Sequence, residues 1–370
     1  MIVYYDESIL SYVSSIRKHF GLESSYPSNS KFDKVIQEKN PKKIFLCLID
    51  GMGANLVNRK LAEDSFLRRN MLYKTTTVFP PTTTAATTSI RNGKAPNENA
   101  WLGWCQYFKE ENRIIIPFLG IDFYDNDVKL GRDFALKQIP ITSTENELNA
   151  RGIKARALNP NFDEDGCDDF NNMVNRLIDY SNNDEYQYIY AYWDKYDSFC
   201  HDHGPSHPIC DAYLNYIDKE LEYLSENIAD DTMLVIVADH GQIDVTGYYN
   251  FNKSKYEKYF VRKPSLEGRA QAFYIKDSLK EEFEIEFKKE FEDTFILLSH
   301  DQVLKTHLFG DLENNERFEE FIGDFIAIAK TPLCFKYDED GSTKMKGHHA
   351  GMMEDELMIP VVVYQRYFLV

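Results

Sequence analysis

The sequence predicts an α/β protein whose mostly parallel central sheet is covered by helices on both faces, a three-layer αβα sandwich. Four short apolar runs have the character of buried strands, and they occupy residues 42–50, 186–194, 232–241 and 358–365. Helical segments lie between them, the clearest being residues 210–228, whose apolar positions are Leu214, Ile217, Leu221 and Leu224. Alternating strands and helices favour parallel strands in one sheet.

The chain has the size and composition of a folded domain with a large core. It contains 370 residues, of which 43% are hydrophobic and 14% aromatic. No internal repeat and no linker rich in Pro, Gly or Ser divides it, so we expect a single domain over residues 1–370. Residues about 248–330 are richer in Lys, Glu and Phe, and we interpret them as an insertion or a subdomain that covers the sheet.

Charge and cysteine usage restrict the partners and the compartment. Sixty acidic against 42 basic residues give a net charge of -18, which argues against nucleic-acid polymers and anionic membranes as partners. The first residues lack the features of a signal peptide, and no apolar stretch is long enough for a membrane helix. Six scattered cysteines are typical of reduced thiols, so we expect a cytoplasmic protein.

Candidate metal ligands follow the predicted strands or lie in Gly-rich loops. They are Asp50, Asp197, His201, Asp239, His240 and His349. In open α/β sheets ligands bind beyond the carboxyl ends of the strands, where these side chains would meet. Asp197 and His201 are four residues apart, so one helical turn places them on the same face.

Mixed Asp and His sites without cysteine are typical of zinc, with manganese as the alternative. The set is large enough for two divalent ions, each with an open position for substrate or water. Two such ions would stabilise the attacking and the leaving oxygen of a phosphoryl displacement. The sequence therefore predicts a two-metal centre.

A threonine-rich run lies upstream of most of these ligands, "VFPPTTTAATTSIRNG" from Val78 to Gly93. It predicts a loop that enters a helix over residues 84–92, with Gly93 beyond its C-terminus. The N–H groups at a helix N-terminus bind phosphate, and a Ser or Thr hydroxyl can act as a covalent nucleophile. One of these hydroxyls is therefore a candidate catalytic group.

Five motifs occur together in one order: "LIDGMG", "FPPTTTAATTS", "DSFCHDHGP", "ADHGQ" and "GHHAGMMEDELMIPVVV". In this the chain resembles the alkaline phosphatase superfamily, and within it the type I phosphodiesterase/nucleotide pyrophosphatase family. The resemblance implies an alkaline-phosphatase-like αβα sandwich with a catalytic domain and two metal ions. It places Asp50, Thr83, Asp239 and His240 around one ion and Asp197, His201 and His349 around the other.

The resemblance also implies that Thr83 is the nucleophile, with Thr82 and Thr84 as alternatives if the alignment slips by one residue. His349 is preferred to His348 because the residues that follow it fit the family's terminal pattern, although Ala350 replaces the usual glycine. Where nucleotide-cleaving members place an asparagine that holds a phosphoryl oxygen, the chain has Trp104, and Asn99 is the alternative. We expect Tyr192 to line the core or the wall of the site.

The expected function is hydrolysis of a small phosphate diester or nucleotide through a phosphothreonine intermediate. A phosphomonoesterase or a phosphonate hydrolase of the same fold is the alternative reaction. A catalytically silent metal-binding module is the alternative from another class. Signatures of other hydrolases are missing, since the chain has no GxSxG motif and no P-loop.

Overall fold

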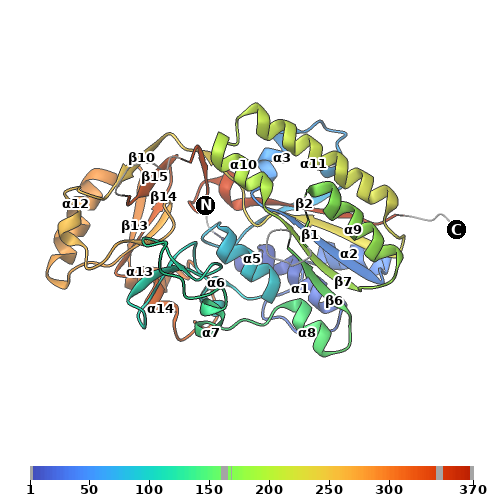
Figure 1. Cartoon of the computed structure of the whole chain (residues 1–370), viewed down its shortest axis with the longest axis horizontal. Coiled ribbons are helices and arrows are strands. Elements are labelled where there is room, and N and C mark those ends of the chain that lie inside the picture. The colour runs from blue at the N-terminus through green and yellow to red at the C-terminus, as the bar shows by residue number, and fades with distance from the viewer. Residues whose placement is uncertain (1–2, 160–165, 168, 339–344, 367–370) are drawn as a thin grey trace.

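A six-stranded sheet forms the centre of the larger of two lobes (Figure 1). The computed structural model describes residues 3–159, 166–167, 169–338 and 345–366. The strands, in spatial order, are β2 (Met71–Thr76), β17 (Met358–Tyr364), β8 (Thr232–Val237), β1 (Lys43–Ile49), β7 (Tyr188–Trp193) and β6 (Ala155–Leu158). All four predicted strands are present, and every residue of β1 and β8 is buried.

Strand β17 corrects one expectation, because it is not parallel. It runs antiparallel to both of its neighbours, and Met358 at its start pairs with Thr76 at the end of β2. The chain enters β17 directly from the short helix α15 (Glu354–Leu357), with no crossover that would return it to the opposite edge of the sheet. A strand without such a crossover must run the other way.

Helices cover both faces of this sheet, as the fold class requires (Figure 1). Helices α9 (Phe170–Asn182) and α11 (Pro208–Asn227) pack together on one face, and α11 confirms the helix predicted over residues 210–228. Helices α1 (Ile9–His19), α5 (Thr83–Asn92) and α8 (Thr144–Ala150) pack together on the other. The remaining helices of this lobe are α2 (Ser30–Lys39), α3 (Ala54–Lys60), α4 (Phe66–Arg69) and α10 (Lys195–His203).

Helix α5 confirms the helix predicted in the threonine-rich run within one residue. Its N-cap residue is Thr82, and Gly93 follows its last residue with φ of 69°, a left-handed conformation that favours glycine. Residues Thr84 to Ile90 are all buried against the sheet lobe.

The second lobe is built mainly from antiparallel strands. Its largest sheet has the order β11 (Ser265–Leu266), β12 (Ala270–Phe273), β14 (Phe325–Ala329) and β13 (Phe295–Ser299). Smaller sheets comprise β3 (Gln106–Phe108), β4 (Arg113–Ile116) and β5 (Ile121–Asp122), and the pair β10 (Gly247–Asn250) and β15 (Leu333–Lys336). A further pair, β9 (Ile243–Asp244) and β16 (Gly347–His348), packs against α10 of the sheet lobe. The helices of the second lobe are α6 (Pro96–Asn99), α7 (Phe134–Gln138), α12 (Lys280–Phe291), α13 (His300–Thr306) and α14 (Phe318–Phe321).

Each lobe has its own hydrophobic core. The large core surrounds the six-stranded sheet, and an aromatic core under α12 gathers Phe251, Phe273, Phe287 and Phe335 in the second lobe. A further cluster joins Trp101 and Phe134 to Leu266, so segments near residues 100–141 and 248–338 pack together away from the main sheet. The assignment of the chain to one domain with a covering subdomain stays a prediction.

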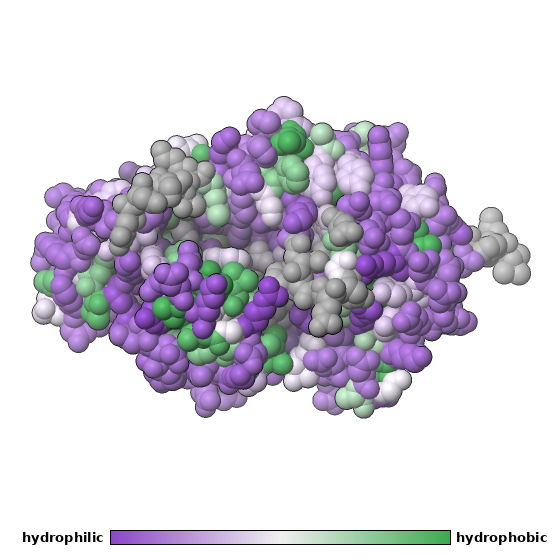
Figure 2. Space-filling model, viewed as in Figure 1, coloured by the Kyte–Doolittle hydropathy of each residue, from purple (hydrophilic) through white to green (hydrophobic). Residues whose placement is uncertain are grey.

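The face shown in Figure 2 is largely hydrophilic. Among the described residues no helix is both long and apolar enough to cross a membrane. A cytoplasmic location stays a prediction.

Candidate metal and catalytic centre

The predicted ligands come together at the edge of the six-stranded sheet where the parallel strands end. Asp50 directly follows β1, and Asp239 and His240 follow β8. Helix α10 begins two residues after β7 and carries Asp197 and His201. His349 lies in the segment that leads into β17, whose start is at this same edge because the strand is antiparallel.

Asp50, Asp239 and His240 form the first group of candidate ligands. One ligand atom from each lies within 4.8 Å of the others. His240 Nε2 is 3.3 Å from Asp50 Oδ1 and 3.4 Å from Asp239 Oδ2. His240 Nδ1 lies 3.0 Å from Gly241 O, which can only accept, so Nδ1 carries a proton and Nε2 faces the carboxylates.

Two buried carboxylate oxygens in this group, Asp50 Oδ1 and Asp239 Oδ2, have no hydrogen bond to any residue that the structure describes. Burial and repulsion from Asp239 and Asp197 raise the pKa of Asp50 well above its ordinary value. Burying unpaired carboxylates side by side is costly unless a cation lies between them. The donor set therefore fits a divalent cation.

Asp197, His201 and His349 form the second group, whose ligand atoms also lie within 4.8 Å of one another. His201 Nε2 is 3.1 Å from Asp197 Oδ2, while its Nδ1 donates to Gly347 O at 2.9 Å. His349 Nδ1 donates to Pro81 O at 3.0 Å, which leaves its Nε2 for another partner. Orienting imidazoles through backbone carbonyls in this way is typical of metal sites.

The charges within the second group are strongly coupled. Burial opposes the ionised form of Asp197, but His201 and His349 outweigh it and hold the pKa of this carboxyl below its ordinary value. Burial also opposes the charged form of His201, yet Asp197 raises its pKa to about 9. Burial and the nearby His240 lower the pKa of His349, which favours the neutral form that binds metals.

The two groups are adjacent. The rings of His240 and His349 are stacked with their centroids 3.8 Å apart and their planes inclined by 21°. One imidazole of each group is thus in van der Waals contact with the other. The two groups of candidate ligands are therefore direct neighbours.

Thr83 is the threonine that reaches the first group. Its Oγ1 lies 3.2 Å from His240 Nε2 and 3.4 Å from Asp50 Oδ2. Thr82 Oγ1 instead donates to Glu267 Oε1, and Thr84 Oγ1 is buried with no hydrogen-bond partner in the described part of the chain. Of the three alternatives, only Thr83 places its hydroxyl against candidate ligands, and it does so as the first residue of α5.

Besides the predicted ligands, two side chains hydrogen-bond to members of the two groups, and a third, Glu267, contacts Thr82 beside the centre. Tyr192 OH donates to Asp50 Oδ2, and Gln242 Nε2 donates to Asp197 Oδ1. Glu267 accepts from Thr82 Oγ1 and from the backbone N–H of Trp104 at 2.7 Å. Tyr192 lies in the apolar run of residues 186–194 and Gln242 in the motif "ADHGQ", so their positions in the sequence could have placed them near the site. Glu267 belongs to the second lobe, and no motif in the sequence indicates its position.

Other predicted positions take structural roles. His348 Nδ1 accepts from the backbone N–H of His349 at 2.9 Å. His348 belongs to neither group of candidate ligands. Asn99 Nδ2 donates to Lys94 O at 3.1 Å, near the far end of α5 from Thr83. Ala350 has φ of 86°, a left-handed conformation, which explains why glycine is usual at this position.

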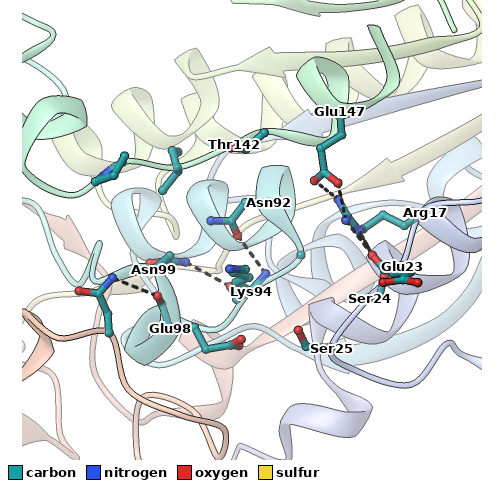
Figure 3. A pocket seen from close by; sticks show the side chains of 14 residues that line it. Arg17, Glu23, Ser24, Ser25, Asn92, Lys94, Glu98, Asn99, Thr142 and Glu147 are labelled. Atoms are coloured by element: carbon teal, nitrogen blue, oxygen red, sulfur yellow. Dashed lines mark hydrogen bonds and ion pairs between the residues drawn. The ribbon is translucent and has the colours of Figure 1, made fainter. Parts of the chain in front are cut away.

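A polar cavity of about 590 Å³ lies away from the two groups, beside the C-terminal end of α5 (Figure 3). Arg17 points across it to Glu147, and its Nη1 lies 2.8 Å from Glu147 Oε1. Since α5 has 10 residues, this end lies about 15 Å from Thr83. The cavity therefore has no direct role at the candidate centre.

Known proteins support this assignment of the fold. The murine ectonucleotide pyrophosphatase/phosphodiesterase 5 is 14% identical, with a TM-score of 0.65 over 86% of this chain and 87% of that one. The human protein of the same name is 14% identical, with a TM-score of 0.67 over 87% of each chain. A phosphonoacetate hydrolase of Sinorhizobium meliloti 1021 is 12% identical, with a TM-score of 0.64 over 87% and 90%. No curated protein sequence matches the chain significantly.

The family model for type I phosphodiesterase/nucleotide pyrophosphatase matches residues 132–352. The match covers more than half of the chain and includes all of the second group, together with Asp239 and His240 of the first. Asp50 and Thr83 lie before it, and the fold brings them to the same place. The chain belongs to the type I phosphodiesterase/nucleotide pyrophosphatase family.

Proposed function

We propose that the chain is a metal-dependent phosphodiesterase or nucleotide pyrophosphatase in which Thr83 is the nucleophile. The observation that carries this proposal is the position of Thr83 Oγ1, within 3.4 Å of both His240 Nε2 and Asp50 Oδ2 at the N-terminus of α5. A hydroxyl there meets candidate metal ligands and also the helix N–H groups that attract phosphoryl oxygens.

The residues of the centre fit two divalent cations, with zinc proposed ahead of manganese because both groups combine carboxylates with imidazoles. Asp50, Asp239 and His240, with Thr83, would hold one ion, and Asp197, His201 and His349 would hold the other. When bound, such ions supply positive charge that favours the alkoxide form of a hydroxyl and stabilises the transition state.

The reaction proposed for Thr83 has two displacements. Thr83 Oγ attacks phosphorus in line, and the bond from phosphorus to the leaving oxygen breaks as the ester bond to Thr83 forms. The hydroxyl proton passes to solvent, and the leaving oxygen takes one up. Water then attacks phosphorus, the Thr83 ester bond breaks, and Thr83 recovers its proton, while the N–H groups of α5 hold the phosphoryl oxygens throughout.

Relatives of similar fold support the substrate class. The murine protein has also been solved as an inactive threonine-to-alanine variant in complex with AMP, which supports a nucleotide-type substrate and a threonine nucleophile. The bacterial phosphonoacetate hydrolase was solved with phosphonoformate, which supports a phosphonate hydrolase as the second candidate. Nucleotide-cleaving members have an asparagine that holds a phosphoryl oxygen where this chain has Trp104. This difference is the reason to retain a phosphonate hydrolase as the second candidate function.

A substrate panel tests the proposal. Bis-p-nitrophenyl phosphate, p-nitrophenyl thymidine monophosphate, p-nitrophenyl phosphate and phosphonoacetate are compared with added zinc or manganese. We expect the two diesters to be hydrolysed fastest, and Thr83→Ala to lose at least about 10³-fold in kcat while keeping its metal. Thr88→Ala, on the same helix, is the control. Metal-loaded protein that hydrolyses none of the four compounds would overturn the proposal.

A further inference from the structure

Glu267 is a buried carboxyl group that the proposed reaction does not use. Its side chain is 7% exposed and reaches from the second lobe to the residue before the proposed nucleophile. Two hydrogen bonds converge on its Oε1, one from Thr82 Oγ1 and one from the backbone N–H of Trp104. A carboxylate held in this way fixes the rotamer of Thr82.

The backbone around Glu267 is held rigidly. Leu266 has φ of 71°, unusual for a residue with a side chain, and its backbone N–H bonds to Cys105 O at 2.7 Å. On the other side, a Cβ added to Gly268 would lie 2.6 Å from Phe335 O, so the chain there is closely packed. A strained and tightly packed backbone of this kind is typical of functional sites.

The contact with Glu267 keeps Thr82 from its usual task. Thr82 is the N-cap residue of α5, with φ of -143° and ψ of 149°, the conformation in which a threonine side chain accepts from the N–H two or three residues ahead. It makes no such bond. The first helical amide is that of Ala86, which bonds to Thr82 O at 2.9 Å, so the N–H groups of Thr83, Thr84 and Ala85 precede the helical ladder.

We propose that Glu267 is a positioning residue that draws the Thr82 hydroxyl away from the end of α5, so that the N–H groups there stay open for a phosphoryl group. This inference rests on the proposed function, because it assigns those N–H groups to substrate. The second lobe thereby acts on the anion site through Thr82 and without contacting substrate. Without Glu267, the Thr82 hydroxyl turns to cap its own helix and occupies an N–H group that the phosphoryl oxygens need.

The test measures binding of inorganic phosphate to the zinc-loaded full chain by calorimetry, so it does not depend on turnover. Glu267→Gln keeps an oxygen that accepts from Thr82 and Trp104 but removes the charge, and it is the reference for Glu267→Ala. We expect Glu267→Ala to bind phosphate about 10-fold more weakly than Glu267→Gln, as expected for loss of one hydrogen bond to an anion.

The double variant Thr82→Val/Glu267→Ala separates positioning from other effects of the alanine. Valine suits the extended backbone of residue 82 but cannot cap, so the double variant should regain affinity to within about threefold of Glu267→Gln. The backbone N–H of Trp104 lacks its acceptor both in Glu267→Ala and in the double variant. A recovery of phosphate affinity in the double variant is therefore due to the change at Thr82. A double variant as weak as Glu267→Ala, or a Glu267→Ala as tight as Glu267→Gln, would overturn the inference.

Thr82→Val alone provides a test that survives if the alanine variants fail to fold. Since no hydroxyl is left to cap α5, it should bind phosphate as tightly as wild type does, within about threefold. A loss of 10-fold or more would mean that the hydroxyl itself contacts phosphate, and would contradict the inference. Absence of ester hydrolysis in the substrate panel, with these phosphate affinities as expected, would remove the proposed function and leave the role of Glu267 in place.

Discussion

Gly51 leaves the space in which Asp197 lies. A Cβ built on Gly51 would be 2.9 Å from Asp197 Oδ1 and 3.1 Å from its Cβ, and Gly51 has φ of 73°. Because Gly51 directly follows Asp50, this close approach brings a ligand of the first group beside a ligand of the second. The distance between the two groups therefore depends on the absence of a side chain at position 51.

Gly51→Ala should displace Asp197 and reduce metal binding by the second group. Gly21→Ala is a matched control, since Gly21 has the same φ of 73° but a Cβ added there would meet no atom of the described residues within 4 Å. Both variants should lose about 1–2 kcal/mol of stability through the left-handed backbone. Metal analysis should show that only Gly51→Ala loses bound zinc, and an unchanged zinc content in this variant would be inconsistent with the geometry.

Replacing His349 tests the choice between two neighbouring histidines. His349→Asn removes one ligand of the second group, so we expect about one bound ion per chain in place of two. His348→Asn, at a ring that lies outside both groups, should keep both ions. Elemental analysis of dialysed protein measures this. Equal losses in the two variants, or a loss only at His348, would show that the ligand is misassigned.

The ionisation of Glu267 should make stability depend on pH. Burial raises its pKa from the ordinary value of 4.5 to about 7. A raised pKa means that the folded state holds the proton more tightly, so wild type loses stability relative to Glu267→Gln as pH rises from about 4.5 to 7. The shift corresponds to on the order of 3 kcal/mol at most.

Denaturant unfolding of the chelator-treated proteins checks this prediction. The difference in unfolding free energy between the two proteins should be constant at pH 4 and below. As the pH rises to 7 it should change in favour of Glu267→Gln, and above pH 7 it should level off. Contributions from groups that do not interact with Glu267 cancel in the difference, whereas the interaction of Glu267 with His201 and His240 is part of it. A difference that is constant from pH 4 to 8 would show that Glu267 is not held in a costly ionised form.

Much of the fold was predictable because its signals are local. The four apolar runs predicted four strands of the central sheet, and the spacing of Leu214, Ile217 and Leu221 predicted α11. The outer strands β2 and β6 were missed, since β2 is mostly half-buried with polar residues in its second half, and β6 has only four residues. The direction of β17 could not be predicted, because it depends on the edge of the sheet from which the preceding helix α15 leads the chain into the strand.

The candidate ligands were predictable for a related reason. Asp50, Asp239 and Asp197 each lie close to the end of a recognisable strand, and parallel strands bring such positions together. Glu267 follows the two-residue strand β11 and meets Thr82 only through the packing of the two lobes. No periodicity or motif in one sequence reports a contact of that kind.

The most direct test of the central claim is to trap the threonine ester. The zinc-loaded protein is mixed with p-nitrophenyl thymidine monophosphate, quenched in acid within the first turnovers, digested and analysed by mass spectrometry. Because p-nitrophenol is the leaving group, the account predicts a thymidylyl adduct, thymidine monophosphate esterified through phosphorus to the threonine. It should lie on the peptide that contains residues 78–91, with fragment ions that locate it on Thr83, and should be missing from Thr83→Ala. An adduct on Thr82 or Thr84, or active turnover with no adduct at any quench time, would contradict it.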